Sequence, residues 1–326
     1  MILGAGAMAR KHADAYRAIP GVEIVAVANR GEARARQFAT DFEIPNVFHD
    51  FNEALASAGA DIVSVCVPTN LHPELAIAAM ERGLHVVTEK PIALTEEAAR
   101  LMIDASNRTG RKLTVIFNRR FNTVWEELKR RLGSIGSPMV YNTQEIRSIR
   151  PKLPMHSRSG NGGPVIDCCV HDFDMLRELF GEPVSVFATG SAFGGNKPFL
   201  APITDIAVDT AQITVEFAAG HRAYLLYAWG FPAGPSYWQY REFMGPDGIV
   251  RLMGEYGEEV HHYRKDGIRE VVEQLPENGH REIIRQFIDA VRSDGPVPVD
   301  PEEALIALRL SLAALDSIES GKKVEL

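Results

Sequence analysis

Short apolar, β-branched runs alternate with helical stretches over the first 117 residues of the chain. This alternation is typical of βαβ units that build a parallel sheet. The helical stretches have recognisable ends: Pro73 stands in a first turn, Thr95 offers a capping hydroxyl, and Gly83 and Gly110 follow the last turns. The predicted strands cover residues 2–3, 22–28, 61–67, 85–89 and 113–117, and the predicted helices cover residues 8–19, 73–82 and 95–109.

After residue 117 the pattern changes to longer runs in which apolar and polar residues alternate. Turns at residues 218–220 and 245–248 indicate antiparallel hairpins. The chain also contains predicted strands over residues 139–146, 210–217 and 221–229, helices over 122–132, 164–180, 281–292 and 301–321, and a Pro/Ser/Gly-rich loop over 150–163. The sequence therefore predicts an α/β protein, with a parallel-sheet domain over residues 1–118 and an α+β domain over residues 119–326. We expect a large, mostly antiparallel open sheet in the second domain, and a last helix able to pack back on the first.

Composition fits a two-domain globular protein of the cytoplasm. A chain of 326 residues with 45% apolar residues can bury two sizeable cores. Charged residues make up 24% of the chain and the formal net charge is -8 with both signs mixed, so no nucleic-acid partner is expected. No stretch approaches the ~18 apolar residues of a membrane span, and no signal peptide is apparent, so we expect no membrane partner. Cys66, Cys168 and Cys169 form no CxxC pair, which fits small buried residues in reducing surroundings.

The first predicted strand is unusually short. It has only two residues before Gly4, where strands of parallel sheets usually have about five or six. We therefore expect a native start upstream of Met1, through a misassigned start codon or a trimmed chain. A mass spectrum of the native protein that begins at Met1 would contradict this expectation.

A glycine-rich turn follows the first strand. The run Gly4-Ala5-Gly6-Ala7-Met8-Ala9 fits the dinucleotide fingerprint, with alanine at the last place. Gly4 permits the tight turn, Gly6 lets the backbone approach a pyrophosphate, and Ala9 allows close packing of the helix. The first helical turn, at Ala7 and Met8, offers unpaired N–H groups to the phosphates. The sequence therefore predicts a bound NAD(P) cofactor.

The end of the second strand bears on the choice between NAD and NADP. It carries Asn29-Arg30, where an NAD enzyme usually places an acidic residue on the ribose 2′-hydroxyl. Neutral Asn29 would not repel a 2′-phosphate, and Arg30 and Arg34, about one helical turn apart, could bind one. These residues favour NADP. If both arginines are solvated surface charges, NAD remains the alternative.

Two further strands end in polar segments at the edge where open α/β sheets bind ligands. One strand is followed by Pro68, Thr69, Asn70 and His72, and the next by Glu89, Lys90 and Pro91. We expect these segments to bind the cofactor. Lys90 should face the nicotinamide crevice, where it could polarise a substrate oxygen, and a solvated surface lysine is the alternative.

The predicted helix over residues 164–180 carries a polar group within an apolar surface. Asp167 and His171 are four residues apart, so both should occupy one helix face, with Asp174 one turn further. A buried imidazole beside a carboxylate is suited to a general base. Structural ion pairing is one alternative. A metal site of Asp167, His171 and Asp174 is another, but no further His/Cys cluster supports it, so no metal is expected.

Together these motifs resemble those of the Gfo/Idh/MocA oxidoreductases, the family of glucose-fructose oxidoreductase and inositol dehydrogenase. The resemblance covers essentially the whole chain, through the glycine turn, residues 68–72, 89–91 and 162–171 in order. It implies a Rossmann domain, a C-terminal open sheet for substrate binding and subunit contact, and redox chemistry at a sugar or polyol carbon. Two departures are the short first strand and Asn29 in place of the acidic residue of NAD-dependent members.

By this resemblance, Lys90 matches the lysine that contacts nicotinamide and substrate, Asp167 and His171 match the catalytic pair, and the Lys90-Pro91 bond matches one that is often cis. We expect an NAD(P)-dependent dehydrogenase in which His171 takes the hydroxyl proton, Asp167 orients substrate or imidazole, and Lys90 stabilises charge on oxygen. The alternatives are NAD-dependent glycoside cleavage or elimination without net redox, and a non-catalytic nucleotide-binding sensor.

Candidate substrate contacts are Arg120, Arg147, His156 and Trp229. The three basic residues could equally be surface cations, and Trp229 could equally be a core residue. The expected partner is a small sugar or polyol. The resemblance also implies a homodimer or homotetramer.

Overall fold

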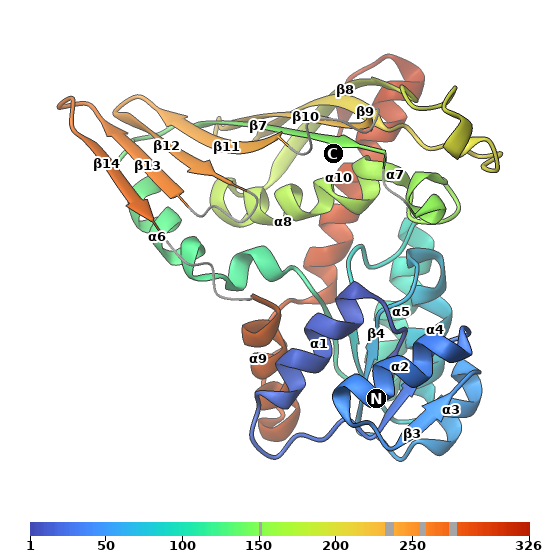
Figure 1. The fold of residues 1–326 in the computed structure, drawn as a ribbon. Helices are drawn as coiled ribbons and strands as arrows, with labels where there is room; N and C mark the ends of the chain where they lie inside the picture. Colours follow the sequence, from blue (N-terminus) through green and yellow to red (C-terminus); the bar gives the residue numbers. More distant parts are fainter. Residues whose placement is uncertain (150–151, 232–237, 255–258, 274–278) are drawn as a thin grey trace. The chain divides into compact units, whose positions relative to one another are not determined.

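The computed structural model describes residues 1–149, 152–231, 238–254, 259–273 and 279–326 (Figure 1). The chain divides into two compact units. The first consists of Met1–Phe121 and Asn278–Leu308, and the second of Asn122–Glu277 and Arg309–Leu326. The chain thus returns to the first unit near its end. The sequence suggested such a return only for the last helix, whereas the returning segment also contains the helix before it.

The described part of the first unit contains a six-stranded parallel sheet of order β3-β2-β1-β4-β5-β6. Its strands are β1 Ile2–Leu3, β2 Ala26–Ala28, β3 Asn46–Phe48, β4 Ile62–Val65, β5 His85–Thr88 and β6 Leu113–Val115. The order reverses between β1 and β4, so right-handed crossovers put the helices that follow these two strands on opposite faces. The predicted Rossmann sheet is confirmed, and the reversal marks the edge at which ligands bind.

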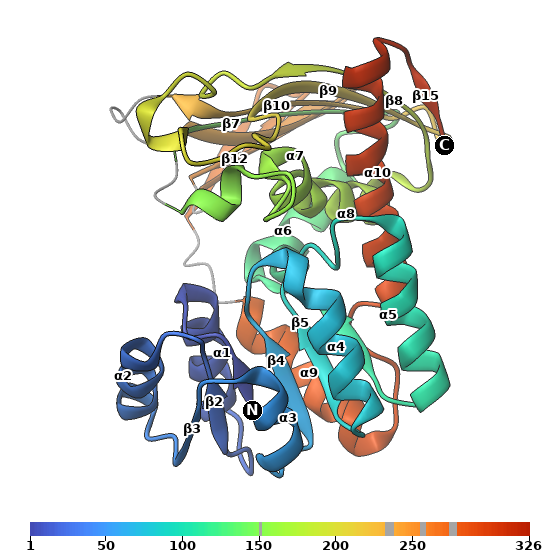
Figure 2. The same cartoon turned by 90° about the vertical axis from the view of Figure 1, so that its right-hand side faces the viewer.

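Helices flank this sheet. They are α1 Ala7–Arg17, α2 Glu32–Phe42, α3 Phe51–Ser57, α4 His72–Glu81, α5 Glu96–Thr109 and α9 Gly279–Ser293. Helix α1 packs beside α9, and α4 beside α5 (Figures 1 and 2). The predicted ends of α5 are confirmed: the Thr95 hydroxyl accepts from the Ala98 N–H at 3.2 Å, and Gly110 takes the left-handed conformation at φ 66°.

The described part of the second unit contains a nine-stranded sheet of order β14-β13-β12-β11-β7-β10-β9-β8-β15. Its strands are β7 Val140–Ser148, β8 Pro183–Ser191, β9 Thr210–Phe217, β10 Arg222–Phe231, β11 Trp238–Gly245, β12 Gly248–Met253, β13 Glu259–Arg264, β14 Arg269–Glu273 and β15 Val324–Glu325. Among the described strands of this sheet, only β7 and β10 pair in parallel. The mostly antiparallel sheet and both predicted hairpins, β9 with β10 and β11 with β12, are confirmed.

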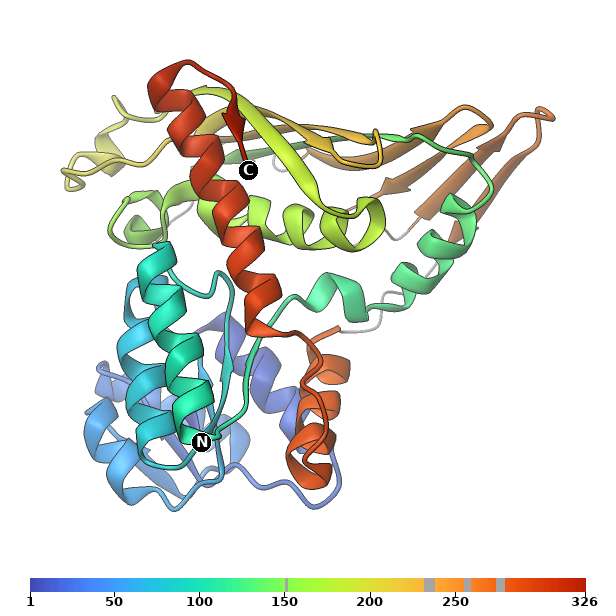
Figure 3. The same cartoon turned by 180° about the vertical axis from the view of Figure 1, so that it is seen from behind.

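Helices of the second unit cover one face of that sheet (Figures 1 and 3). They include α6 Thr123–Leu132, α7 Gly163–Asp167 and α8 Cys169–Phe180. The last helix, α10 Pro301–Ser320, begins in the first unit and ends in the second. The predicted loop over residues 150–163 contains a short 3-10 helix, η3 Leu153–His156, and its first two residues lie outside the described part of the chain.

The prediction of a single helix over residues 164–180 is wrong in one respect. The structure divides it into α7 and α8 at Cys168, whose backbone lies at φ -109° and ψ -44°. The His171 N–H there bonds to the Cys168 carbonyl three residues back at 3.0 Å, which tightens the turn relative to an α-helix. Asp167 therefore ends one helix and His171 belongs to the next, so their four-residue spacing does not describe a regular helix face.

Candidate active site

The glycine turn at the start of α1 is built to approach an anion. Gly4 has φ +103°, and a Cβ atom there would lie 2.3 Å from the Cys66 carbonyl oxygen, so only glycine fits. At Gly6 a Cβ atom would meet nothing within 4 Å, and no side chain caps the helix. Ala9 is fully buried, as close packing of α1 requires. The N–H groups of the first turn and the positive end of the helix dipole therefore fit a pyrophosphate.

The segment after β2 carries the residues expected near the adenosine ribose. The Asn29 amide donates to the Gly31 carbonyl at 3.0 Å, which holds the turn into α2. The Arg30 guanidinium lies over the Phe51 ring, 5.6 Å from its centroid, and is exposed, as is Arg34 on the first turn of α2. This edge thus presents two exposed guanidinium groups.

The segment after β4 turns back into the unit at His72. Pro68 and Asn70 are exposed, whereas Thr69, in the 3-10 helix η1 Thr69–Leu71, and His72 are buried. The His72 ring lies between two carbonyl oxygens, with Nδ1 2.9 Å from that of Pro91 and Nε2 3.0 Å from that of Val67. The His72 ring thus links the two loops that follow β4 and β5, and contact of His72 with the cofactor stays a prediction.

The turn after β5 carries Lys90 at its centre. Lys90 is half-buried and follows Glu89, whose side chain is buried. The Lys90-Pro91 peptide bond is cis, as the sequence resemblance implied. The Glu89 N–H donates to the Val65 carbonyl at 3.1 Å, so the turn continues the β4–β5 pairing by one residue.

The Glu89 carboxylate points into a buried polar cluster, and binding of the cofactor by the Glu89 segment stays a prediction. Its Oε1 lies 3.0 Å from Nε2 of His12 on α1 and 3.7 Å from Nε2 of His280 on α9. The other His12 nitrogen, Nδ1, lies 2.9 Å from the Ser64 hydroxyl, which in turn is 2.8 Å from the Tyr16 hydroxyl. The cluster therefore connects two helices and two neighbouring strands of the sheet.

The charge of Glu89 is stabilised by this cluster. Burial by itself raises the pKa of the carboxyl, but hydrogen bonds from His12 and His280 overcome burial and hold the pKa well below its usual range. Burial lowers the pKa of His280 and of His72. Burial, reinforced by Glu89, raises the pKa of the Cys66 thiol. Glu89 is therefore a carboxylate at neutral pH, and because a carboxylate only accepts, the imidazoles donate to it.

Sequence reasoning missed His12 and His280. The available signal was a set of polar residues at positions that otherwise face a core: His12 and Tyr16 are four apart on α1, and Ser64 lies within the buried strand β4. His280 could not be found this way, because its segment rejoins the first unit from far along the chain.

In the second unit, two glycines lead into the helices that carry Asp167 and His171. Gly162 and Gly163 both have positive φ, 75° and 71°, and a Cβ atom at Gly163 would lie 2.7 Å from that of Ala207. Asp167, at the end of α7, is 6% exposed, and His171, in the first turn of α8, is 9% exposed. Both side chains are thus largely removed from water, as a general base of tuned basicity requires.

The neighbouring carboxylate, Asp172, has a structural role. It is fully buried and accepts hydrogen bonds from the hydroxyls of Tyr141, at 2.8 Å, and Tyr227. Arg241 lies 3.6 Å from the same carboxylate. Burial, together with Asp172, raises the pKa of Tyr141 well above its usual value, so the phenol keeps its proton. This network joins α8 to the sheet and fixes the helix that carries His171.

Three of the four candidate substrate residues contact a carboxylate of their own unit, and contact of the four with a substrate stays a prediction. Arg120, in the 3-10 helix η2 Asn118–Phe121, pairs with Glu303 at 2.7 Å within the first unit. Arg147 pairs with the buried Glu145 at 2.9 Å, and Trp229 is fully buried with its indole N–H donating to Glu145 at 3.3 Å. His156 is also buried, in η3. Burial of Trp229 makes it a core residue of the second unit.

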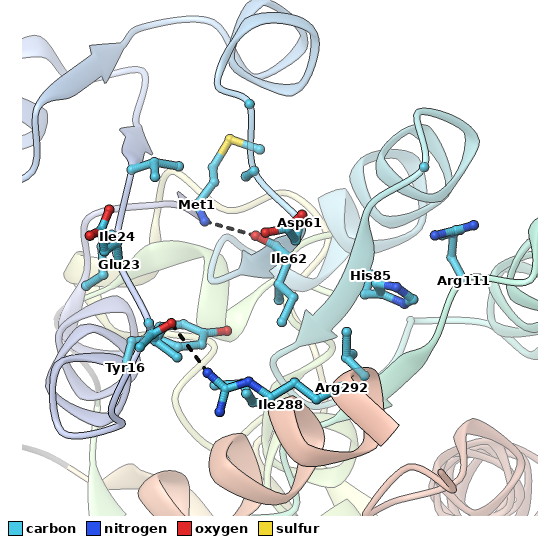
Figure 4. Close-up of a pocket in the computed structure, with 17 residues that line it drawn as sticks. Met1, Tyr16, Glu23, Ile24, Asp61, Ile62, His85, Arg111, Ile288 and Arg292 are labelled. Carbon is cyan, nitrogen blue, oxygen red and sulfur yellow. Dashed lines mark hydrogen bonds between the residues drawn. The ribbon is translucent and has the colours of Figure 1, made fainter. Parts of the chain in front are cut away.

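The first unit contains a cavity of about 420 Å³. It opens at the amino ends of β1, β4 and β5, among Met1, Asp61, Ile62 and His85 (Figure 4). The Met1 ammonium donates to the Ile62 carbonyl at 2.9 Å, and burial lowers its pKa to about 5. Because cofactor-binding loops leave the carboxyl ends of the strands, this cavity is at the opposite edge of the sheet.

Within the described ranges, no three His, Cys, Asp or Glu side chains are grouped so as to hold a metal ion. Nor does any helix in the described part of the chain combine the length and apolar character needed to cross a membrane.

Two family models match the chain. Residues 1–117 match that of the Gfo/Idh/MocA oxidoreductase family, described as an NAD-binding Rossmann fold. Residues 129–326 match that of the C-terminal alpha/beta domain of the same family. The matches cover both regions that carry the candidate residues.

Similar proteins extend over the full length of the chain. The scyllo-inositol 2-dehydrogenase (NAD(+)) of Bacillus subtilis (strain 168) is 29% identical over 335 residues, covering 100% of this chain and 95% of that protein. The D-glucoside 3-dehydrogenase of Escherichia coli (strain K12) is 28% identical over 346 residues, covering 100% and 96%. The structure of a levoglucosan dehydrogenase in complex with NADH and levoglucosan has a TM-score of 0.86 at 22% identity, covering 99% and 98%. At that identity the last likeness supports the fold alone.

Proposed function

Since this chain belongs to the Gfo/Idh/MocA oxidoreductase family, we propose that it is an NAD(P)-dependent dehydrogenase of a sugar, polyol or related diol. The observation that carries this proposal is the glycine turn. Gly4 fits only as glycine, and the α1 N-terminus behind it is uncapped and open at Gly6. A turn of this kind at the β1–β4 reversal suits a dinucleotide pyrophosphate. The names of the inositol and glucoside dehydrogenases among its relatives support the substrate class.

Three side chains would act on the substrate. When bound, the nicotinamide ring exchanges a hydride with the carbon that bears the reacting oxygen. In the oxidation direction His171 takes the hydroxyl proton, and Asp167 orients the substrate or the imidazole. Lys90 stabilises the negative charge that develops on the oxygen. Reduction uses the same groups in reverse. The low exposure of Asp167 and His171 supports these roles, because water would otherwise compete for the proton.

For the cofactor we propose a preference for NADP within this NAD-binding family. The neutral Asn29, whose amide is used in the turn, and the exposed Arg30 and Arg34 support this preference. NAD remains the alternative, as in the Bacillus relative named for it. The Michaelis constants for the two cofactors distinguish these possibilities, and a strong preference for NAD would contradict the proposal.

We also propose that the protein is a cytoplasmic homodimer or homotetramer without nucleic-acid or membrane partners. The net charge of -8 gives no support to nucleic-acid binding. An exposed row on the second sheet supports self-association. Phe187 and Tyr224 lie on either side of Thr214 in register and are 43% and 39% exposed. Exposed aromatic side chains on one sheet face are typical of protein interfaces.

A substrate screen tests the proposed function. Aldoses, inositols, sugar acids and dihydrodiols are incubated with NAD or NADP, and absorbance at the reduced-nicotinamide band is followed. Net change in absorbance with one class is the expected result. Product formation without net absorbance change would favour glycoside cleavage or elimination through transient oxidation. Cofactor binding with neither change would favour a nucleotide-binding sensor.

A further inference from the structure

Buried imidazoles from three helices hold the turn that carries Lys90. His12 of α1 and His280 of α9 meet the Glu89 carboxylate, directly before the lysine. His72 of α4 meets the Pro91 carbonyl at 2.9 Å, directly after it. All of these groups belong to the first unit. The main chain on both sides of Lys90 is therefore fixed by buried side chains of the first unit.

We propose that Glu89, His12, His72 and His280 are positioning residues for Lys90, which they hold in register with the cofactor-binding loops. This inference rests on the dehydrogenase function proposed above, because it assigns a task to the lysine of that reaction. The proposed reaction assigns these four residues neither proton transfer nor stabilisation of charge on the substrate oxygen.

The free energy lost when the Glu89 carboxylate is desolvated indicates a role for the cluster beyond packing. A carboxylate buried at 6% exposure loses its hydration, and only well-directed donors offset that loss. An apolar side chain could fill the same space without this cost. Apolar contacts are not directional. A carboxylate between two imidazoles, in contrast, constrains both the orientation of each helix and its distance from the Lys90 turn. Glu89 thus orients the residue that follows it.

The helices involved are those that begin at the cofactor-binding segments. Helix α1 starts at the glycine turn, and His12 lies in its second turn. Helix α4 starts directly after the loop of Pro68 and Asn70, and His72 is its first residue. The glycine turn and the loop of Pro68 and Asn70 are therefore each joined to the Lys90 turn by one imidazole. A shift of either segment would move Lys90 with it, so the position of the lysine amine relative to the cofactor would be kept.

A double-mutant cycle tests whether Glu89 acts through Lys90. Turnover is measured for the wild type, Glu89→Gln, Lys90→Ala and the double variant, with the substrate found in the screen. We expect Glu89→Gln to lower kcat by about 10- to 100-fold, as misplacement of a catalytic group by about 1 Å does, with little change in cofactor Kd. In the Lys90→Ala background the same change should cost less than about twofold. Equal losses in both backgrounds would overturn the proposal, because a general loss of folding is additive.

A milder pair of variants covers the case in which Glu89→Gln does not fold. His280→Gln keeps an N–H donor for the carboxylate, and His280→Ala does not. We expect kcat to fall in the alanine variant and to be largely restored in the glutamine variant. Equal kcat in both would contradict a positioning role. Glu97→Gln, at an exposed position in the first turn of α5, is the matched control and should leave kcat unchanged.

A chemical readout separates failure of this inference from failure of the proposed function. The rate at which acetic anhydride modifies Lys90 is followed by mass spectrometry, without any substrate. Loss of the neighbouring anion and of the fixed turn should raise this rate in Glu89→Gln by about threefold or more, while Lys112 of the same unit reacts as before. An unchanged rate at Lys90 would overturn the positioning role even if the wild type turned over no substrate.

Discussion

At the residue scale, each unit contains a buried carboxylate that is paired with hydrogen-bonding side chains. Glu89 is held by His12 and His280 in the first unit, and Asp172 by Tyr141 and Tyr227 in the second. Each lies next to a proposed catalytic residue, Glu89 before Lys90 and Asp172 after His171. Because an unpaired buried carboxylate would be strongly destabilising, these pairings fix the local backbone. The proposed catalytic side chains are thereby attached to rigid positions.

The Glu89 cluster should make stability depend on pH. The folded pKa of Glu89 lies below the unfolded value of about 4.3, so its contribution is complete above that value and is lost as pH falls towards the folded pKa. His72 and His280, with folded pKa values below about 6.5, take up protons on unfolding, so their burial adds a loss that begins below that pH. We expect the free energy of unfolding in urea to fall between about pH 7 and 4.

The variant Glu89→Gln isolates the carboxylate in this measurement. Its free energy of unfolding should be lower than that of the wild type at neutral pH, and the difference should shrink below about pH 4, where the Glu89 carboxyl of the unfolded wild type takes up a proton before that of the folded protein does. A difference that stays constant down to about pH 3 would mean that the charge of Glu89 contributes nothing to stability.

At the scale of elements, long periodic segments with caps were predictable and short ones were not. The sequence predicted α4, α5, α6 and both hairpins, because each carries its own start or stop signal. It missed β3, α2 and α3, which lie within residues 32–57, where charged residues are frequent and an edge strand of three residues leaves no periodic pattern. It joined α7 to α8, because the break at Cys168 depends on a main-chain bond rather than on a glycine or proline.

The N-cap of α5 makes a contribution to the free energy of unfolding that is easily measured. Thr95→Ala removes the acceptor for the Ala98 N–H and should lower the free energy of unfolding by about 1 kcal/mol. Thr95→Ser keeps the acceptor and is the matched control, with a much smaller loss expected. The measurement is urea unfolding at neutral pH. Equal stability of the alanine and serine variants would show that the cap is not formed in solution.

At the scale of the whole molecule, the sequence indicated two domains and most of the candidate residues, but not which parts of the chain rejoin. The return of residues 279–308 to the first unit brings His280 to Glu89 and Glu303 to Arg120. Such contacts join residues far apart in the sequence, and no local sequence pattern predicts them. For the same reason the pairing of Arg120 with Glu303 could not be predicted from the sequence.

Self-association through the second sheet can be tested directly. Phe187→Lys and Tyr224→Lys place charges in the exposed row that they form with Thr214, so we expect the assembly to dissociate to smaller species. Sedimentation velocity measures the change. Ile268→Lys, at another exposed apolar position, is the control and should leave the assembly intact. An unchanged mass for both aromatic variants would remove this face from the interface.

The most direct test of the account is the turnover of Lys90→Ala and His171→Ala, measured at the reduced-nicotinamide band beside the wild type and His261→Ala, a control on β13. Loss of a group that moves a proton or stabilises charge typically costs about 10² to 10⁴ in rate. We predict losses of that size for both variants, with cofactor Kd preserved and the control fully active. Near wild-type turnover in either variant would contradict the proposed reaction at that residue.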